Sequence, residues 1–208
     1  NEQNNYRVLA RKYRPNDFSQ LIGQDTLVKT FNNALNKGRL AHAFLLTGIR
    51  GVGKTTTARI IAKALNCIGD GSKKDPSFEI CNNCSPCQSI NNGNFLDVIE
   101  VDAASRTGVD GIREIIDSVI YSPNNARYKV YIIDEVHMLS NAAFNALLKT
   151  LEEPPQNVKF IFATTEIKKI PATIISRCQK FDLQRVDLKT LSNHLKNICQ
   201  NESISFEN

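Results

Sequence analysis

Short apolar runs alternate with helical stretches along most of the chain. Five of these runs are rich in Val, Ile, Leu and Phe and are continuous, not alternating, in hydrophobicity. Such runs are typical of strands that are buried on both faces of a parallel sheet. The predicted strands are Ala43–Thr47, Asp97–Asp102, Lys129–Asp134, Lys159–Thr164 and Cys178–Leu183.

Helical patterns separate the predicted strands. They cover Asp25–Lys37, Lys54–Leu65, Gly108–Ser118 and Asn141–Leu151. Strand–helix alternation predicts a wound α/β fold with a parallel five-stranded sheet. A further helix is expected from Asp187 to about Asn201, after the last strand. The 208 residues therefore fit one large domain over residues 1–183 and the start of a second, helical domain over residues 184–208.

Charge is distributed unevenly along the chain. Residues 1–63 carry eleven Lys or Arg against three Asp or Glu, whereas residues 64–208 carry fifteen against eighteen. A basic first third suggests attraction to polyanions such as nucleotide phosphates, DNA or RNA. A solvated basic face with no partner is the alternative.

The segment of residues 66–93 breaks the alternation and is rich in Gly, Ser, Asn and Cys. It holds four of the six cysteines, Cys67, Cys81, Cys84 and Cys87. The first ten residues are polar and no apolar run is long enough to cross a membrane, so we expect a cytoplasmic protein with no membrane attachment. In a reducing compartment, clustered thiols favour a metal over disulfides.

Four thiolates satisfy the coordination of Zn²⁺ and leave no open position, which predicts a structural zinc site. An iron–sulfur cluster is the chemical rival, because C-x₂-C-x₂-C also begins ferredoxin-type runs; the Cys-Pro expected downstream is absent. Unligated thiols are the third possibility. The histidines His42, His137 and His194 have no ligand-like spacing, and we interpret them as structural.

A phosphate-binding loop is the strongest motif. Residues 48–55 match G-x-x-x-x-G-K-[ST] between a predicted strand and a predicted helix. Its glycines let backbone N–H groups point at phosphate oxygens, and the helix N-terminus adds its dipole. Lys54 would reach the β- and γ-phosphates and Thr55 would offer a hydroxyl to Mg²⁺. The predicted nucleotide-binding residues are Gly48, Ile49, Arg50, Gly51, Val52, Gly53, Lys54 and Thr55.

Two acidic residues end the third predicted strand. Asp134 and Glu135 follow the apolar run of residues 130–133, and such strands end at the ligand-binding edge of an α/β sheet. Asp134 would join Thr55 in holding Mg²⁺, and Glu135 would act as general base on the attacking water. The alternative is that Asp134 only caps the following turn.

Further motifs carry a resemblance to a known family. They are Asp134 to Leu139 (DEVHML), Asn145 to Pro155 (NALLKTLEEPP) and Ser176-Arg177-Cys178. The chain resembles the clamp-loader ATPases of the AAA+ family from about Tyr6 to its C-terminus. The four cysteines after the P-loop helix narrow this to the clamp loader of bacterial DNA polymerase III. Thirteen residues separate Cys67 from Cys81, more than the family usually shows, but thiolate ligation depends on the ligands more than on loop length.

The resemblance implies roles for further residues. Arg177 would be an arginine finger that acts in trans on a neighbouring subunit's ATP, and Thr165 would sense the γ-phosphate. Arg14, Pro15 and Ile22 would lie around the adenosine. Without the family, Arg177 reads as a surface arginine and Thr165 as a strand-end hydroxyl that caps the next turn.

The resemblance also implies the activity and the partners. We expect an ATPase that acts in DNA replication within a ring of five clamp-loader subunits and loads the sliding clamp onto primer–template DNA. Nucleotidyl transfer would belong to the polymerase assembly and not to this chain. The family's second arginine sensor, the rest of its lid and its collar would follow Asn208, so we expect residues 1–208 alone to be mainly monomeric. A small-molecule kinase and a zinc-stabilised DNA-binding module with a silent nucleotide site are the rival readings.

Overall fold

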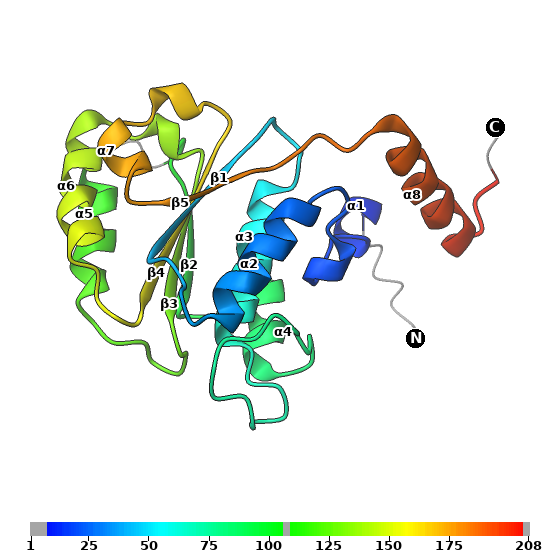
Figure 1. Cartoon of the computed structure of the whole chain (residues 1–208), viewed down its shortest axis with the longest axis horizontal. Helices are drawn as coiled ribbons and strands as arrows, with labels where there is room; N and C mark the ends of the chain where they lie inside the picture. The colour runs from blue at the N-terminus through cyan, green and yellow to red at the C-terminus, as the bar shows by residue number, and fades with distance from the viewer. Residues whose placement is uncertain (1–7, 106–108, 206–208) are drawn as a thin grey trace, which may run out of the picture.

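The computed structural model describes residues 8–105 and 109–205 (Figure 1). Five parallel strands form one sheet in the order β2-β3-β4-β1-β5. The predicted α/β class with a five-stranded parallel sheet is confirmed, and strand ends differ from the prediction by at most one residue. The strands are β1 (Ala43–Thr47), β2 (Val98–Asp102), β3 (Lys129–Asp134), β4 (Val158–Thr164) and β5 (Gln179–Asp182).

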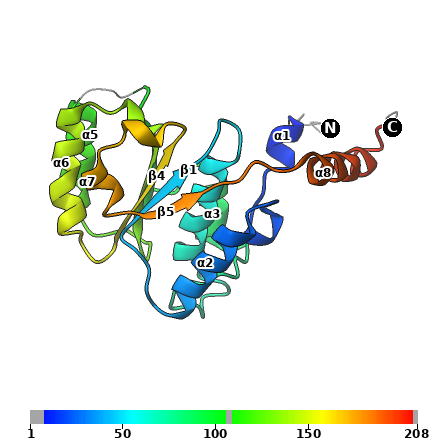
Figure 2. The ribbon, with the colours of Figure 1, turned by 45° about the horizontal axis from the view of Figure 1, so that its top comes forward.

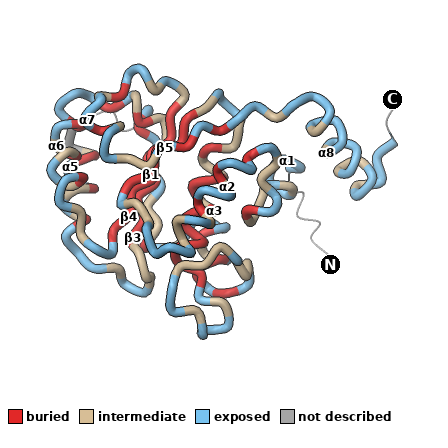
Figure 3. Tube along the Cα trace, in the orientation of Figure 1, coloured by how far each residue is buried: buried red, intermediate tan, exposed pale blue. Residues whose placement is uncertain are grey.

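Helices cover both faces of this sheet (Figures 1 and 2). Helices α2 (Asp25–Asn36) and α3 (Lys54–Asn66) lie on one face. Helices α5 (Val109–Val119), α6 (Asn141–Glu152) and α7 (Ala172–Ile175) lie on the other. Because the sheet is covered on both sides, every residue of β1 and β4 is buried (Figure 3), which is why these strands read as continuous apolar runs.

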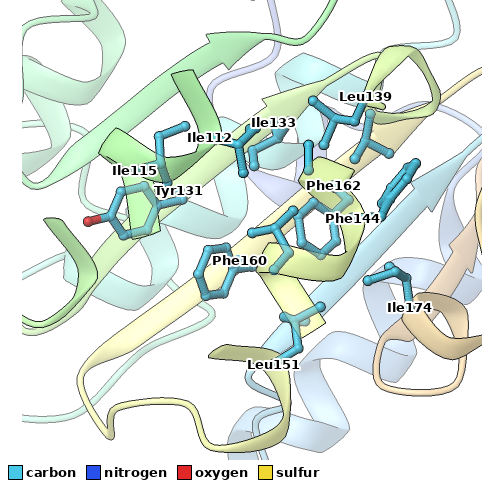
Figure 4. Close-up of a cluster of buried hydrophobic side chains, with 14 of the residues drawn as sticks. Ile112, Ile115, Tyr131, Ile133, Leu139, Phe144, Leu151, Phe160, Phe162 and Ile174 are labelled. Carbon is cyan, nitrogen blue, oxygen red and sulfur yellow. The ribbon is translucent and has the colours of Figure 1, made fainter. Parts of the chain in front are cut away.

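The two faces of the sheet belong to two separate apolar clusters. The cluster under α5 and α6 includes Tyr131, Phe160 and Phe162, with stacked rings whose centroids are 5.4 and 5.9 Å apart (Figure 4). The cluster under α2 and α3 includes Phe31 and Phe44. Successive strand residues point to opposite faces, so β1, β3 and β4 each contribute buried residues to both clusters.

Helix α6 shows how the local sequence sets an element. Ser140 caps its N-terminus by accepting a hydrogen bond from the backbone N–H of Ala143 at 3.2 Å. Phe144, Leu147 and Leu151 then recur at helical spacing, and all three are buried against the sheet.

Helix α4 (Ser85–Asn92) lies inside the segment of residues 66–93, where the sequence pattern predicted no helix. It begins at Ser85-Pro86, where proline is tolerated because its missing N–H has no helical partner. It ends at Gly93, whose φ of +72° is the left-handed conformation that glycine adopts at helix C-termini. The prediction missed it because this helix is short and buries few apolar side chains, Ile90 among them.

The two terminal helices lie away from the sheet. Helix α1 (Leu9–Lys12) and helix α8 (Leu188–Asn201) have no buried residues. They are joined where Glu202 forms a 2.6 Å ion pair with Lys12 and accepts a hydrogen bond from Tyr13. Figure 1 shows α8 connected to β5 by an extended segment and set apart from the rest of the molecule. Leu188 and Leu195 on α8 are exposed.

Three short 3₁₀ turns complete the described elements, at Phe18–Gln20, Val136–Met138 and Ile167–Lys169. Among the helices of residues 8–105 and 109–205, none is long and apolar enough to cross a bilayer.

Candidate nucleotide and metal sites

The predicted phosphate loop connects the C-terminal end of β1 to the N-terminus of α3, as the motif requires. Gly53 precedes the helix with a φ of +102°, a conformation that side chains with a Cβ rarely adopt. Gly48 is required for a different reason: a Cβ there would lie 3.0 Å from the carbonyl oxygen of Leu183 and 2.9 Å from Val52. The loop therefore has the backbone course that the glycines predict.

Lys54 lies within the curve of this loop and is only 6% exposed. Its Nζ donates hydrogen bonds to the carbonyl oxygens of Gly48 and Ile49, each at 3.1 Å. The ammonium group is thus held beside the loop backbone by two neutral acceptors, which it would exchange for phosphate oxygens when a nucleotide binds.

Thr55 and Asp134 meet although they are far apart in the sequence. The hydroxyl of Thr55 donates to Oδ2 of Asp134 at 2.5 Å, and Oδ1 of Asp134 accepts from the N–H of Glu135 at 2.9 Å. The hydroxyl at the N-terminus of the P-loop helix and the carboxylate at the end of β3 are hard oxygen donors, the ligand type that Mg²⁺ takes from such sites. The residues present therefore fit the predicted magnesium ion.

Glu135 faces the end of the neighbouring strand β4. Its Oε2 accepts hydrogen bonds from the hydroxyl of Thr165 at 3.0 Å and from the N–H of Thr165 at 3.2 Å. The backbone of Glu135 has a φ of +46°, which is uncommon for a residue with a side chain. Strain of this kind is held at a site where the surrounding structure fixes the residue.

His137, which the sequence analysis interprets as structural, contacts Glu135. Its Nδ1 lies 3.3 Å from Oε2 of Glu135 and 3.0 Å from Oγ1 of Thr164, while its Nε2 lies 3.5 Å from Glu166. Its side chain is only 6% exposed. The sequence could have indicated this contact, because His137 is two residues after Glu135 and lies on the 3₁₀ turn that follows β3.

The N-terminal segment lies beside the P-loop helix. A cavity of about 720 Å³ is lined by Arg14 and Pro15 on one side and by Thr56 and Arg59 of α3 on the other. Ile22 does not line this cavity. Ile22 is half-buried. It is next to Gly23, where an added Cβ would lie 3.6 Å from the side chain of Val186 in the β5–α8 connection. Two of the three residues predicted around the adenosine thus share a cavity, and the third borders the last connection of the chain.

Arg177 lies on the surface after α7, away from the phosphate loop of its own chain. Its guanidinium forms a 2.6 Å ion pair with Glu152 and donates to the carbonyl of Thr173 at 2.7 Å. The side chain is one-third exposed. Arg177 therefore makes surface contacts with Glu152 and Thr173.

The four clustered cysteines converge on one point. Their sulfur atoms all lie within 4.8 Å of one another, and those of Cys67 and Cys81 are 3.6 Å apart. A tetrahedron of zinc–sulfur bonds of about 2.3 Å has edges of about 3.8 Å, so the four thiols fit a tetrahedral metal. They are supplied by the end of α3, the following loop and the start of α4. The cysteines are Cys67, Cys81, Cys84 and Cys87.

Backbone donors and burial set the acidity of these thiols in opposite ways. Burial acts to raise the pKa of Cys81, but hydrogen bonds to its sulfur outweigh it and lower that pKa; one comes from the N–H of Cys84 at 3.3 Å. Burial raises the pKa of Cys87. A second N–H to sulfur contact joins Cys81 to Cys67 at 3.4 Å. Donors of this kind orient metal-binding thiolates.

Lys63 connects the cysteine cluster to the N-terminal segment. It is 1% exposed, and its ammonium donates to the backbone oxygen of Asn16, to Oδ1 of Asn82 at 3.0 Å and to Oδ1 of Asn91 at 2.8 Å. Burial lowers the pKa of Lys63. Three oxygen acceptors from two segments thus converge on one helix residue.

Comparison with known families gives a match over most of this architecture. The sequence profile of the family described as "DNA polymerase III, delta subunit" matches residues 23–187, which include the P-loop, the acidic strand end and the cysteine cluster. The chain belongs to this family. The clamp-loader resemblance of the motifs is thereby confirmed.

The similar individual proteins are named as particular subunits, which is more specific than the family description. The chain is 53% identical to the DNA polymerase III subunit gamma of Buchnera aphidicola from Schizaphis graminum, covering 98% of this chain and 54% of the relative. It is 52% identical to the DNA polymerase III subunit tau/gamma of Haemophilus influenzae, covering 97% of this chain and 29% of the relative. The chain therefore spans about half or less of the length of the curated relatives it matches.

The fold is shared with a solved motor protein. The RuvB Holliday junction branch migration motor of Thermotoga maritima superimposes with a TM-score of 0.65 over 94% of this chain and 56% of that protein, at 23% identity. This likeness confirms the predicted AAA+ P-loop fold.

Proposed function

We propose that this chain is the ATP-binding and ATP-hydrolysing part of a gamma/tau subunit of the bacterial DNA polymerase III clamp loader. The observation that carries the proposal is the meeting of Thr55 from the P-loop helix with Asp134 from the end of β3, next to Lys54. In a family member, this arrangement supplies the phosphate and magnesium ligands of a P-loop ATPase.

Each group at the site has a separate task in hydrolysis. Lys54 and the loop N–H groups bind the β- and γ-phosphates. Thr55 and Asp134 hold Mg²⁺, which when bound neutralises charge on the phosphate oxygens. Glu135 orients and deprotonates the attacking water, and Thr165, hydrogen-bonded to Glu135, contacts the γ-phosphate. Arg14, Pro15 and Ile22 lie around the adenosine.

Arg177 completes the site of a neighbouring subunit. Arg177 precedes β5, whereas the P-loop follows the opposite end of the parallel strand β1. This separation and the exposure of Arg177 support an action in trans, in which the guanidinium binds the γ-phosphate of the next subunit. The partners implied are other clamp-loader subunits in a five-membered ring, the sliding clamp and primer–template DNA. Residues 184–208 begin the lid domain after the ATPase domain of residues 1–183, which accounts for the exposed leucines of α8.

The cysteine cluster binds zinc in a structural role. Four sulfur ligands within 4.8 Å of one another support a closed S₄ site. Zinc in such a site links the end of α3 to α4 and stabilises the module of residues 66–93. With all four positions taken by protein ligands, the metal activates no water.

The experiment that tests the proposal compares ATP hydrolysis by the full-length subunit, assembled with the other loader subunits, with and without sliding clamp and primed DNA. We expect stimulated phosphate release in the wild type. Glu135→Gln removes the general base but keeps the size of the side chain. It should keep Mg-ATP affinity within about twofold and lower turnover by about 10²–10⁴.

The control is Glu114→Gln, which makes the same change on α5 and should not affect turnover. If clamp and primed DNA do not change the rate of ATP hydrolysis, the clamp-loader function is contradicted, but the ATPase activity is not. A phosphorylated acceptor in place of free phosphate would support the kinase reading instead.

A further inference from the structure

A second cavity, of about 570 Å³, lies at the opposite ends of the strands from the phosphate loop. Three of its lining residues, His42, Tyr128 and Lys159, are at or just before the N-terminal ends of β1, β3 and β4. The P-loop, in contrast, follows the C-terminal end of β1. A strand of five residues is about 17 Å long, so this cavity is separate from the proposed nucleotide site.

Strand register brings these three side chains together. The N–H of Phe160 bonds to the carbonyl of His42 at 2.9 Å, and Val130 pairs with Lys159. Side chains alternate along a strand, so His42, Tyr128 and Lys159 all point to the face that α2 covers. The C-terminal end of α2 and the loop before α4 close the cavity with Leu35, Asn36, Leu40, Asp75 and Pro76.

Lys159 is the most unusual of the lining residues. It is 3% exposed, yet its Nζ has only a long hydrogen bond, 3.4 Å, to the carbonyl of Leu40, and lies 5.2 Å from the ring centroid of Tyr128. No carboxylate in the described part of the chain lies within ion-pair distance of it. A buried cation that lacks an anionic partner is costly, and burial lowers the pKa of Lys159 to about 8.

We propose that this cavity binds a small organic monocarboxylate whose anionic end pairs with the ammonium of Lys159. One buried ammonium balances one negative charge, and a dianion such as phosphate would bring a second charge without a partner. Leu35, Leu40 and Pro76 give the rest of the cavity an apolar wall, and its volume is that of ligand-binding pockets. The amide of Gln156 at the rim offers a further donor.

Besides Lys159, the ionisable residues that line the cavity are Tyr128, His42 and Asp75. The pKa of His42 is lowered, first by burial and then by the charge of Lys159, so this histidine is neutral at pH 7. Asp75 is exposed at the rim and repels an anion. The ligand needs a charged Lys159, which predominates below pH 8. Binding should therefore be constant from about pH 6.5 to 7.5 and weaken as the pH rises beyond about 8.

The experiment uses benzoate and hexanoate as probes and benzamide as the neutral counterpart of benzoate. Titrations of the 208-residue chain at pH 7 are followed by backbone amide NMR shifts. We expect saturable shifts at residues around the cavity with both carboxylates and weaker or no binding of benzamide. Lys159→Met should weaken carboxylate binding at least tenfold, about 1.4 kcal/mol. Asp75→Asn should strengthen it.

Lys37→Met is the matched control. It removes the same charge from the exposed end of α2, outside the cavity lining, and should change carboxylate affinity less than twofold. Mg-ATP affinity should be unchanged in both lysine variants. If Lys159→Met does not fold, the pH dependence of carboxylate binding and the comparison with benzamide still test the proposal. The proposal is wrong if the carboxylates give no saturable shifts at the cavity, if benzamide binds equally well, or if a folded Lys159→Met binds as the wild type does.

Discussion

Replacing Lys54 tests the phosphate site most directly. The change Lys54→Ala removes the ammonium and leaves the loop glycines in place. In the structure this ammonium makes two hydrogen bonds of 3.1 Å to the carbonyls of Gly48 and Ile49. Binding a nucleotide exchanges these neutral acceptors for phosphate oxygens, so the affinity gained is the difference between the two sets of bonds.

The size of that difference can be worked out. The ammonium is charged in both sets of bonds, so the gain comes from the charge of the phosphate oxygens. A charged group makes a hydrogen bond stronger by about 0.5–2 kcal/mol, from about 1 to about 1.5–3 kcal/mol, and this increment is used here for each carbonyl that a phosphate oxygen replaces. Exchanging two bonds therefore gains about 1–4 kcal/mol, with a central value near 2 kcal/mol. A loss of about 2 kcal/mol weakens binding about thirtyfold. We expect Lys54→Ala to weaken Mg-ATP and Mg-ADP binding by at least tenfold.

The assay is titration calorimetry of the 208-residue chain, with thermal unfolding to show that the variant is folded. Lys29→Ala is the matched control because Lys29 is an exposed lysine of α2, and it should leave affinity within twofold. If a folded Lys54→Ala binds Mg-ATP within threefold of the wild type, Lys54 does not contact the phosphates and the site assignment is refuted.

Two further predictions concern the metal and the trans contact. Metal analysis of the purified protein should find one zinc per chain. Chelation of the zinc should speed amide exchange in residues 66–93, while Mg-ATP affinity stays within threefold. Iron in place of zinc would contradict the assignment. Arg177→Ala should leave ATP binding nearly intact in the assembled loader and lower clamp- and DNA-stimulated turnover by about 10³–10⁵, with Arg185→Ala as the control. Equal turnover by the isolated 208-residue chain, shown to be monomeric by light scattering, would refute an action in trans.

The sequence predicted best what short segments determine by themselves. The P-loop course follows from glycines within eight residues, and the strands were identified within one residue because burial on both faces leaves a continuous apolar run. The place of Asp134 beside Thr55 also followed, since the C-terminal ends of parallel strands share one edge of a sheet. Thr55 and Asp134 are 79 residues apart in the sequence, yet the Thr55 hydroxyl lies 2.5 Å from Oδ2 of Asp134.

Features that depend on register or on polar networks could not be predicted. The grouping of His42 with Lys159 requires the pairing of β1 with β4, which no local pattern encodes. The contact of His137 with Glu135 depends on the left-handed backbone of Glu135. Helix α4 was missed because its stability depends on packing around the cysteines and not on a long apolar stripe.

The position of Lys63 suggests how loss of the proposed zinc could alter nucleotide binding slightly, within the threefold limit given above, without a role for the metal in the chemistry. Helix α3 carries Lys54 and Thr55 at its N-terminus and Lys63 more than two turns later. The ammonium of Lys63 donates hydrogen bonds to Asn82 and Asn91, which belong to the cysteine-containing module of residues 66–93. It also donates to the backbone oxygen of Asn16, the residue after Pro15. Loosening the module removes two of the three acceptors and leaves a buried charge less well satisfied, which is costly. The strain would fall on the segment of Arg14 and Pro15 while the phosphate loop, fixed by its own glycines and by β1, keeps its shape. Metal loss should therefore affect contacts to the adenosine before contacts to the phosphates.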